Sequence, residues 1–338
     1  MNEDNSLGPF LDAVKGLDIE YDMAPIDQEY STFTGVGAEP LDFKSYAKDI
    51  PCQAACPAKT RVPHYIQALA EGNPDKAYLI NQEDNVFSGV LGRVCSRPCE
   101  DGCRHNWTDI NGPVHICHLK RGASDYKTSA PSPLPAWFEE TGKKVAVIGG
   151  GPSGLTAARE LRRYGHSVTI FERDSVLGGM MVQGIPVFRL PRETVAEEVK
   201  AIIDSGIDVK LNTPVDAEMM QGIIDEYDSV LVSVGTVHAS NLKLPGLPED
   251  GHAVSGLSFM HDYNMGDIEE GSMKGQNVII VGGGFTAVDC ARSCARAALR
   301  LVGAEGNVTI MYRRTAGQMA AKYDEIEEMG VENIHIET

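Results

Sequence analysis

The sequence lacks the features that mark membrane, secreted and nucleic-acid-binding proteins. It contains no apolar run of the ~20 residues that a transmembrane helix needs, and its acidic N-terminus does not have the order of a secretory signal peptide. Its 30 lysines and arginines face 48 acids, for a net charge of −18. Nucleic-acid phosphates need a basic face, so this charge argues against such a partner. We expect a soluble, cytoplasmic protein that does not insert into membranes.

A thiol–disulphide exchange motif is also missing. None of the 8 cysteines forms a C-x-x-C pair, which a thioredoxin-reductase-like enzyme would need. Cys290 and Cys294 lie about one helical turn apart, and we interpret both as small packing residues. Disulphides are not expected in a reducing compartment. The other cysteines, gathered between Cys52 and Cys117, therefore indicate a metal site.

The spacing of these cysteines favours iron over zinc. The pattern is Cys52-x3-Cys56-Pro57, then Cys95-x3-Cys99-x3-Cys103, then Cys117. Structural zinc is possible on spacing alone. A cysteine followed by proline, with partners far along the chain, is more typical of a [4Fe–4S] cluster. The candidate metal ligands are Cys52, Cys56, Cys95, Cys99, Cys103 and Cys117.

Composition divides the chain into four regions. Residues 1–50 form an acidic extension, either a solvated segment or a docking arm for a partner. Residues 51–140 hold the cysteines among short helical patterns and end in a proline-rich linker, and residues 141–262 and 263–338 each contain a strand, a glycine turn and a helix. This order predicts an α/β fold, with an N-terminal helical iron–sulfur domain followed by two Rossmann-like dinucleotide-binding domains. The expected strands are Val145–Ile148, Ser167–Phe171, Ile207–Leu211, Ser229–Val232 and Asn307–Tyr312.

The first glycine loop follows a predicted strand and opens a predicted helix. Gly149, Gly151 and Gly154 give G-x-G-x-x-G, which lets the backbone approach a pyrophosphate at the helix N-terminus. Glu172 ends the next strand, where an acid binds a ribose hydroxyl. We therefore predict FAD at this loop. Its predicted binding residues are Gly149, Gly151, Pro152, Ser153, Gly154, Glu172, Arg173, Gly178, Gly179, Gly235 and Thr236.

The second glycine loop has a different partner. Gly282, Gly284 and Ala287 give G-x-G-x-x-A, and the strand that follows ends in Arg313 and Arg314 instead of an acid. Two guanidinium groups suit the 2′-phosphate of NADP, although two solvated arginines would also fit the pattern. We predict NADP(H) rather than NAD(H), bound by Gly282, Gly284, Phe285, Thr286, Arg313 and Arg314.

Short motifs elsewhere in the chain carry a family resemblance. They are Cys56-Pro57, Gly92-Arg93-Val94-Cys95, Pro98-Cys99-Glu100, Leu119-Lys120-Arg121, Gly184-Ile185-Pro186, Arg189-Leu190-Pro191 and Tyr312-Arg313-Arg314. With these motifs the chain resembles the small (β) subunit of NADPH-dependent glutamate synthase and the N-terminal half of dihydropyrimidine dehydrogenase. The resemblance adds Arg189 to the candidate cofactor-binding residues. It implies that hydride passes from the nicotinamide to the flavin and that single electrons leave through the cluster to another subunit of a larger complex. No catalytic side chain is expected, since the cofactors hold the chemistry.

The chain departs from the family in its cluster ligands. An additional C-x-x-C pair of the family is absent before Cys52, so one cluster is expected rather than two. Cys56, Cys95 and Cys99 match one family cluster, whose fourth ligand is often Glu or Gln at a position near Lys120. Lysine is a poor ligand, which leaves Cys117, Cys103 or Cys52 to complete the set. Cys52 and Cys103 match the ligands of the other cluster.

The second nucleotide domain is expected to be incomplete. From Gly275 to Thr338 there is room for one strand, the glycine loop, a helix, a second strand and a short third strand at Asn333–Ile336. We expect either a fragment of a longer chain or a domain completed by another polypeptide. The alternative function is a non-catalytic electron-relay or assembly subunit with a vestigial nicotinamide site.

Overall fold

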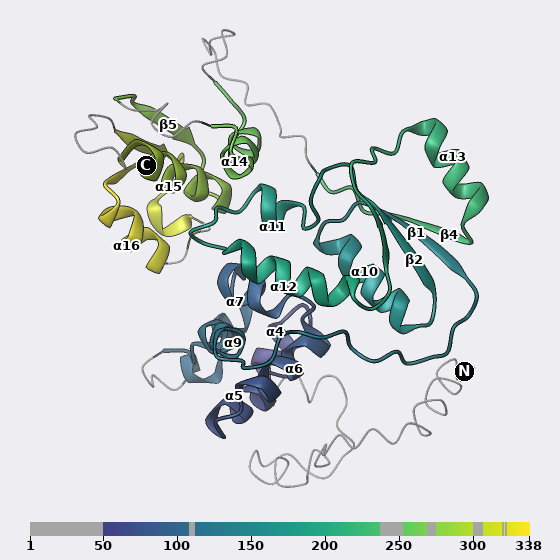
Figure 1. Cartoon of the computed structure of the whole chain (residues 1–338). Helices are drawn as coiled ribbons and strands as arrows, with labels where there is room; N and C mark the ends of the chain where they lie inside the picture. Colours follow the sequence, from purple (N-terminus) through teal and green to yellow (C-terminus); the bar gives the residue numbers. More distant parts are fainter. Residues whose placement is uncertain are drawn as a thin grey trace, which may run out of the picture.

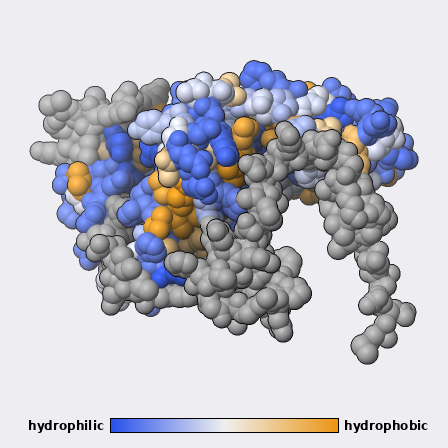
Figure 2. All heavy atoms as spheres, turned by 90° about the horizontal axis from the view of Figure 1, so that it is seen from below, coloured by the Kyte–Doolittle hydropathy of each residue, from blue (hydrophilic) through white to orange (hydrophobic). Residues whose placement is uncertain are grey.

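The structure, a computed structural model of the whole chain, describes residues 50–107, 112–236, 253–268, 275–299, 307–319, 321 and 323–338 (Figure 1). The predicted acidic extension, apart from Ile50, lies outside the described residues. Among the described helices, none combines the length and the apolar character needed to cross a bilayer. Figure 2 shows one face of the molecule, on which apolar residues reach the surface in patches among mostly polar ones.

Short helices form the iron–sulfur domain. Their bounds are α4 Pro51–Ala55, α5 Val62–Ala70, α6 Pro74–Asp84, α7 Ser88–Val94, α8 Pro98–Asp101, η1 Arg104–Trp107 and α9 Ile116–Asp125. Helices α5 and α6 carry a proline in their first turn, where its missing N–H costs nothing. Tyr65 of α5 is fully buried and donates a hydrogen bond to the Ile116 carbonyl at 2.9 Å. This bond connects the first half of the domain to the start of α9.

The flavin domain is built on a parallel sheet with the order β3-β2-β1-β4. The strands are β1 Lys144–Ile148, β2 Ser167–Phe171, β3 Asp208–Lys210 and β4 Ser229–Val232, and the helices are α10 Pro152–Arg163, α11 Met180–Gln183, α12 Arg192–Ile203 and α13 Ala217–Glu226. Val147 and Ile170 pack on one face of the sheet with Leu155 of α10. Phe171 packs on the other face with Ile223 of α13, as alternating strand side chains require. The four strands predicted for this domain are therefore present, and Ile207–Leu211 is one residue shorter at each end.

The nicotinamide domain has a second parallel sheet, with the order β5-β6-β7. Its elements are α14 Gly256–Met265, β5 Val278–Val281, α15 Phe285–Leu299, β6 Val308–Met311, η2 Ala316–Gln318, α16 Tyr323–Val331 and β7 Ile334–Glu337. The core lies between the sheet and α15, where Val288 and Ile310 are fully buried. Ile279 and Val281 are 62% and 53% exposed, so the described residues leave one face of β5 uncovered. The short third strand predicted at Asn333–Ile336 is present as β7.

Glu198 joins the iron–sulfur domain to the flavin domain. This α12 residue is 4% exposed, and its carboxylate accepts hydrogen bonds from the Tyr78 hydroxyl, at 3.0 Å, and from the Gly89 and Val90 N–H groups, at 2.7 and 3.2 Å. The Ser88 hydroxyl adds a fourth bond at 3.3 Å. Helix α12 is thus fixed against α6 and the first turn of α7.

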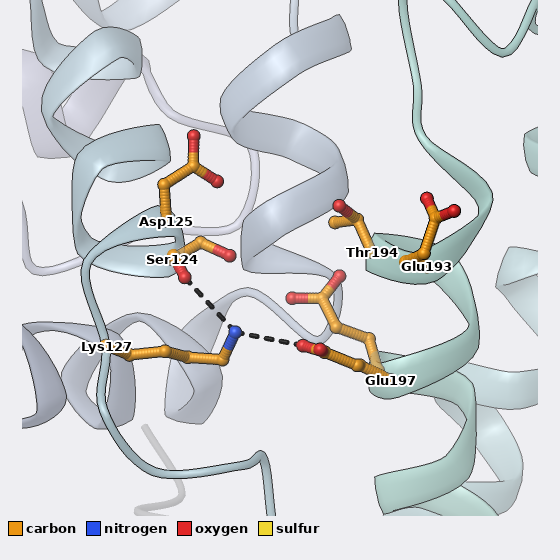
Figure 3. Close-up of a pocket in the computed structure, with 7 residues that line it drawn as sticks. Ser124, Asp125, Lys127, Glu193, Thr194 and Glu197 are labelled. Atoms are coloured by element: carbon orange, nitrogen blue, oxygen red, sulfur yellow. Dashed lines mark hydrogen bonds and ion pairs between the residues drawn. The ribbon is translucent and has the colours of Figure 1, made fainter.

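A small polar pocket lies beside this junction, between α9 and α12 (Figure 3). Lys127 spans it, with its ammonium 3.1 Å from the Ser124 carbonyl and 2.9 Å from the Glu197 carboxylate. The pocket is lined by Ser124, Asp125, Lys127, Glu193, Thr194, Glu197 and Glu198. The contact between the iron–sulfur and flavin domains therefore includes polar side chains at this pocket.

The linker between the two domains is attached along its length. The Thr128 and Ser129 N–H groups both donate to Asp75, at 3.0 and 2.8 Å. Further along, the Arg163 guanidinium lies 3.8 Å from the centre of the Trp137 ring. Immediately before β1, the Thr141 N–H donates to the Gly165 carbonyl at 2.9 Å. The linker is thus bound first to the helical domain and then to the sheet domain.

Candidate functional site

The cluster region depends on close packing between α7 and α9. A side chain at Gly92 of α7 would lie 2.8 Å from the backbone of Arg121 on α9, so only glycine permits this approach. Cys95 caps the end of α7, Cys99 lies in α8 and Cys117 lies in the first turn of α9. Three helices therefore converge, and each brings one thiol to the same place.

Hydrogen bonds connect these three thiols. Cys117 shares its proton with Cys95 and Cys99, which lowers the pKa of Cys99 and lowers that of Cys95 to about 6. The pKa of the Cys117 thiol is correspondingly raised, and burial raises it further. Sulfurs that share protons in this way titrate as a group. If iron replaces the shared protons, the three thiolates can bind it, because thiolates are the ligands of iron–sulfur clusters.

Of the other three cysteines of the domain, Cys52 packs in the same core as Cys95, Cys99 and Cys117. Burial raises the pKa of Cys52, and the nearby Cys103 and Cys99 raise it further. Cys103 is buried. Cys56 lies 3.3 Å from the Thr60 hydroxyl. The structure therefore places Cys52 near both Cys103 and Cys99, and it joins Cys117 to Cys95 and Cys99 by hydrogen bonds.

Glycines shape the first nucleotide loop, between β1 and α10. Gly149 has a φ of 106°, in the region that favours glycine. A side chain at Gly154 would lie 1.9 Å from the Gly149 carbonyl oxygen, so glycine is needed where α10 packs against the strand end. Pro152 and Ser153 form the first turn of α10, where unpaired N–H groups can bind an anion.

Glu172 lies against this loop, as the spacing predicts. It is 7% exposed, and its carboxylate accepts hydrogen bonds from the Gly150 N–H at 2.6 Å and the Asp174 N–H at 2.9 Å. Arg173 is exposed instead and pairs with Asp174 at 3.2 Å. The acid thus has the position expected of a ribose ligand, whereas Arg173 lies on the surface.

Gly178 and Gly179 pack against one side of the first nucleotide loop. The Gly178 N–H donates to the Gly150 carbonyl at 2.8 Å, and a side chain at Gly179 would lie 2.9 Å from the Gly151 Cα. Gly235 and Thr236 follow β4 and are exposed. Gly178 and Gly179 therefore pack directly against the backbone of Gly150 and Gly151, a contact that a side chain at Gly179 would block.

The second nucleotide loop lies at the end of β5. The Gly282 N–H donates to the Met311 carbonyl at 3.0 Å, which holds the loop beside the end of β6. A side chain at Gly283 would lie 2.6 Å from the Tyr312 ring. Apart from Gly284 and its chain neighbours, no atom of the described residues lies within 4 Å of the position of a Cβ at Gly284, and Phe285 and Thr286 open α15 beside it. This open surface is compatible with a bound nucleotide.

Arg313 and Arg314 follow β6 and are exposed. They follow Tyr312, which packs over the second loop, so both lie at the edge of this nucleotide site. In the described part of the chain neither arginine forms an ion pair with a carboxylate. Both guanidinium groups are therefore available to an anionic ligand.

Arg189 lies elsewhere than at the flavin loop. Its guanidinium forms ion pairs with Asp289 of α15, at 2.8 Å, and with Glu325 of α16, at 2.9 Å. It also lies 5.5 Å from the centre of the Phe285 ring. The residue that the resemblance assigns to cofactor binding thus links the flavin domain to the nicotinamide domain.

Comparison with known protein families divides the chain into the same helical and nucleotide-binding parts. Residues 143–337 match the family model of the pyridine nucleotide-disulphide oxidoreductases, which covers more than half of the chain. The chain belongs to this family. Residues 45–131 match the model for dihydropyrimidine dehydrogenase domain II, which carries a 4Fe–4S cluster. These two domain types use an iron–sulfur cluster, a flavin and a nicotinamide. The cofactors predicted from the sequence are therefore confirmed.

Curated relatives of this oxidoreductase include three kinds of redox subunit. The chain is 36% identical over 308 residues to the NADP(+)-dependent formate dehydrogenase subunit beta of Moorella thermoacetica, covering 84% of this chain and 42% of the relative. It is 32% identical over 295 residues to the NADPH-Fe(3+) oxidoreductase subunit beta of Geobacter sulfurreducens, with 85% and 42% covered. It is 34% identical over 306 residues to the glutamate synthase [NADPH] small chain of Azospirillum brasilense, with 84% and 60% covered. The resemblance inferred from the motifs is confirmed.

The chain matches only part of the length of each of these relatives. The chain spans 42% of the first two relatives and 60% of the third. Among solved structures, a 2-naphthoyl-CoA reductase complex matches 82% of this chain and 41% of its own, at 21% identity and a TM-score of 0.48. The relatives bear out an oxidoreductase subunit and do not favour the alternative of a non-catalytic relay.

Sequence reasoning missed the roles of Glu198, Asp289 and Glu325 in this oxidoreductase. Glu198 was not singled out, because its hydrogen-bond donors lie more than 100 positions away in the chain. Asp289 and Glu325 were not recognised as partners of Arg189 for the same reason. One local signal for the grouping of Cys117 with Cys95 was present, namely Gly92 at the end of a short helix, since a glycine within a helix often marks close packing.

Proposed function

We propose that this chain moves electrons between NADP(H) and a partner protein, with FAD at the first glycine loop and one [4Fe–4S] cluster in the helical domain. The observation that carries the proposal is the coexistence, in one chain, of two intact glycine loops and three converging thiols. When bound, the nicotinamide and the flavin exchange a hydride, and the cluster accepts or donates single electrons. The protein binds and orients these groups and needs no catalytic acid, base or nucleophile.

The proposed flavin site uses Glu172 on the adenosine ribose. Its carboxylate already lies at the loop, where it accepts hydrogen bonds from the Gly150 and Asp174 N–H groups. The first turn of α10, which begins at Pro152, offers backbone N–H groups to the pyrophosphate. Glu172→Gln should weaken FAD retention, measured as the flavin released on dilution. Unchanged flavin content would contradict this role.

The proposed cluster ligands are Cys56, Cys95, Cys99 and Cys117. The hydrogen bonds among the last three thiols support their membership, and Cys56 is carried over from the family resemblance. Cys52 and Cys103 form a pair without further described thiols of a second cluster, which favours one cluster over two. Replacing Cys117 with Ala should abolish bound iron, since a [4Fe–4S] cluster needs its protein ligands.

Cysteines outside the iron–sulfur domain give a matched control for this experiment. Cys290 is buried like Cys117, and burial raises the pKa of its thiol to about 12. Cys290→Ala should keep its full iron content in anaerobically prepared protein. Zinc without iron in the wild-type protein, or full iron in Cys117→Ala, would contradict the ligand assignment.

The test of the whole function is a redox titration under anaerobic conditions. Added NADPH should bleach the flavin absorbance of the wild-type protein, and reduction of the cluster should follow. In Cys95→Ala the flavin should still bleach, but no electron should reach a cluster. A flavin that NADPH leaves oxidised would overturn the proposal. The partner protein would be a further subunit of a redox complex, as the names of the relatives suggest, and the cytoplasmic location stays a prediction.

A further inference from the structure

Lys120 is a buried cation in the iron–sulfur domain. It lies on α9, three residues after Cys117 and therefore on the same face of the helix, and it is 4% exposed. A buried ammonium is strongly destabilising unless an opposite charge compensates it. In the described part of the chain no carboxylate forms an ion pair with Lys120. The described residues therefore supply no ion-pair partner for this charge.

The converging thiols lie near this ammonium. Lys120 acts electrostatically on Cys95, Cys99 and Cys117 and favours the thiolate form at each. The nearest acidic group in these interactions is Glu100, which is 8% exposed and whose carboxylate accepts the Cys117 N–H at 2.8 Å. Glu100 therefore fixes the start of α9, the helix that also carries Lys120.

An ammonium cannot bind iron through its nitrogen while it keeps its proton, so the role of Lys120 is electrostatic. We propose that Lys120 is the counter-charge of the iron–sulfur cluster, stabilising the bound cluster and raising its reduction potential. The inference rests on the proposed function. Four thiolates outweigh the positive charge of the iron–sulfur core, so the assembly is an anion, and reduction adds one electron to it. No bond is made or broken at the Lys120 nitrogen.

The direction of the effect follows from these charges. A fixed cation close to the sulfurs stabilises the reduced cluster more than the oxidised one, because the reduced cluster carries one more negative charge. Removing the cation should therefore make the cluster harder to reduce. A buried charge is little screened by salt, so the effect should persist at high ionic strength.

The test uses the full chain, reconstituted anaerobically, in three variants. Lys120→Met keeps the apolar stem and removes the charge, and Lys120→Arg keeps the charge. Arg121→Met is the matched control, because this neighbour on α9 is 54% exposed in its side chain and pairs with Asp125 at 3.1 Å. Bound iron and sulfide are counted, and the midpoint potential is measured by titration followed by electron paramagnetic resonance.

We expect the equilibrium constant for cluster reduction to fall at least tenfold in Lys120→Met, which is about 59 mV for one electron. Lys120→Arg and Arg121→Met should stay near the wild-type potential. A Lys120→Met protein with a complete cluster and an unchanged potential would overturn this inference alone. A wild-type protein without the spectroscopic signal of the cluster would overturn the proposed function as well.

A variant that fails to take up the cluster is also informative. If Lys120→Met binds no cluster while Lys120→Arg does, and both have the wild-type circular dichroism, the positive charge is needed to hold the anion and the inference stands. If both variants lose the cluster together with helical structure, Lys120 serves only packing and the inference is wrong.

Discussion

Individual side chains decide which nucleotide the second loop would accept. Arg313 and Arg314 are exposed at the end of β6, beside a loop whose Gly284 is open to a ligand. The matching position in the flavin domain holds Glu172, which is buried and hydrogen-bonded to backbone. An acid accepts bonds from ribose hydroxyls, whereas a guanidinium binds a phosphate. We therefore predict that the two loops differ in ligand, through Glu172 in the first and through Arg313 and Arg314 in the second.

This difference predicts the behaviour of Arg313→Ala. A charge-assisted bond to phosphate contributes about 1.5–3 kcal/mol, so its loss should weaken NADPH binding roughly ten- to a hundredfold. NADH lacks the 2′-phosphate, and its affinity is the internal control that should barely change. The measurement is the dissociation constant for each nucleotide by flavin-fluorescence titration. An equal loss for both nucleotides would show that Arg313 does not contact the 2′-phosphate.

At the scale of elements, one carboxylate holds the contact between α12 and α7. Glu198 accepts four hydrogen bonds, from Tyr78, Ser88, Gly89 and Val90. Truncating it to Ala would leave these buried donors without an acceptor, at a cost on the order of 3 kcal/mol in the free energy of unfolding. Urea denaturation measures this cost. Glu197→Ala, on the same helix but 51% exposed in its side chain, should cost far less, and equal costs would contradict the assigned role.

Glu198 also predicts a pH dependence of stability. Burial raises the pKa of this carboxyl above the ordinary 4.5, even though its hydrogen bonds act in the opposite direction. An acid with a raised pKa in the folded state binds its proton more tightly there than in the unfolded chain. Its contribution to stability is therefore full below the unfolded pKa and falls as the pH rises through the folded pKa.

The measurement is the urea midpoint of the wild-type protein and of Glu198→Gln from about pH 5 to pH 8. The variant cannot ionise at this position, so its midpoint should decline less with pH than that of the wild type, although it starts lower because an amide nitrogen faces a backbone donor. Glu197→Gln should keep the wild-type slope. Parallel slopes for wild type and Glu198→Gln would show that Glu198 does not titrate in this range.

The sequence predicted the elements better than the contacts between them. Strand periodicity and the glycine spacing predicted β1, β2 and the position of Glu172, because these depend on neighbours along the chain. The grouping of Cys117 with Cys95 depends instead on how closely α7 and α9 pack at Gly92, which is a tertiary property. Local sequence could also not assign the partner of Arg189, since Asp289 lies 100 positions away.

For the whole molecule, the ion pairs of Arg189 are the main charged link between the flavin and nicotinamide domains. Its guanidinium and the Asp289 carboxylate are 12% and 8% exposed in their side chains. Burial raises the pKa of Asp289, while Arg189 acts to lower it. Removing Arg189 takes the cation away from the buried Asp289 carboxylate, which is more costly than removing both, whereas removing Asp289 leaves Arg189 its ion pair with Glu325.

A double-mutant cycle tests this link. Arg189→Ala and Asp289→Ala should each destabilise the nicotinamide domain, and the double variant should lose less than their sum, with a coupling of about 1–3 kcal/mol. Hydrogen exchange of α15 should increase in each single variant, while exchange of β1 stays the same. Additive losses would mean that the two side chains do not act as a pair.

The attachment of the linker to both domains has a kinetic consequence. Electrons tunnel between redox centres at rates that fall exponentially with separation, so a hinged connection would make transfer wait for a diffusive encounter. Here Asp75 holds the start of the linker, Trp137 and Thr141 hold its end, and Glu198 closes the junction. The distance from the three thiols of Cys95, Cys99 and Cys117 to the first glycine loop is therefore fixed by the packing of the two domains. Electron transfer within one chain should accordingly be insensitive to solvent viscosity, whereas delivery to a separate partner should slow as viscosity rises.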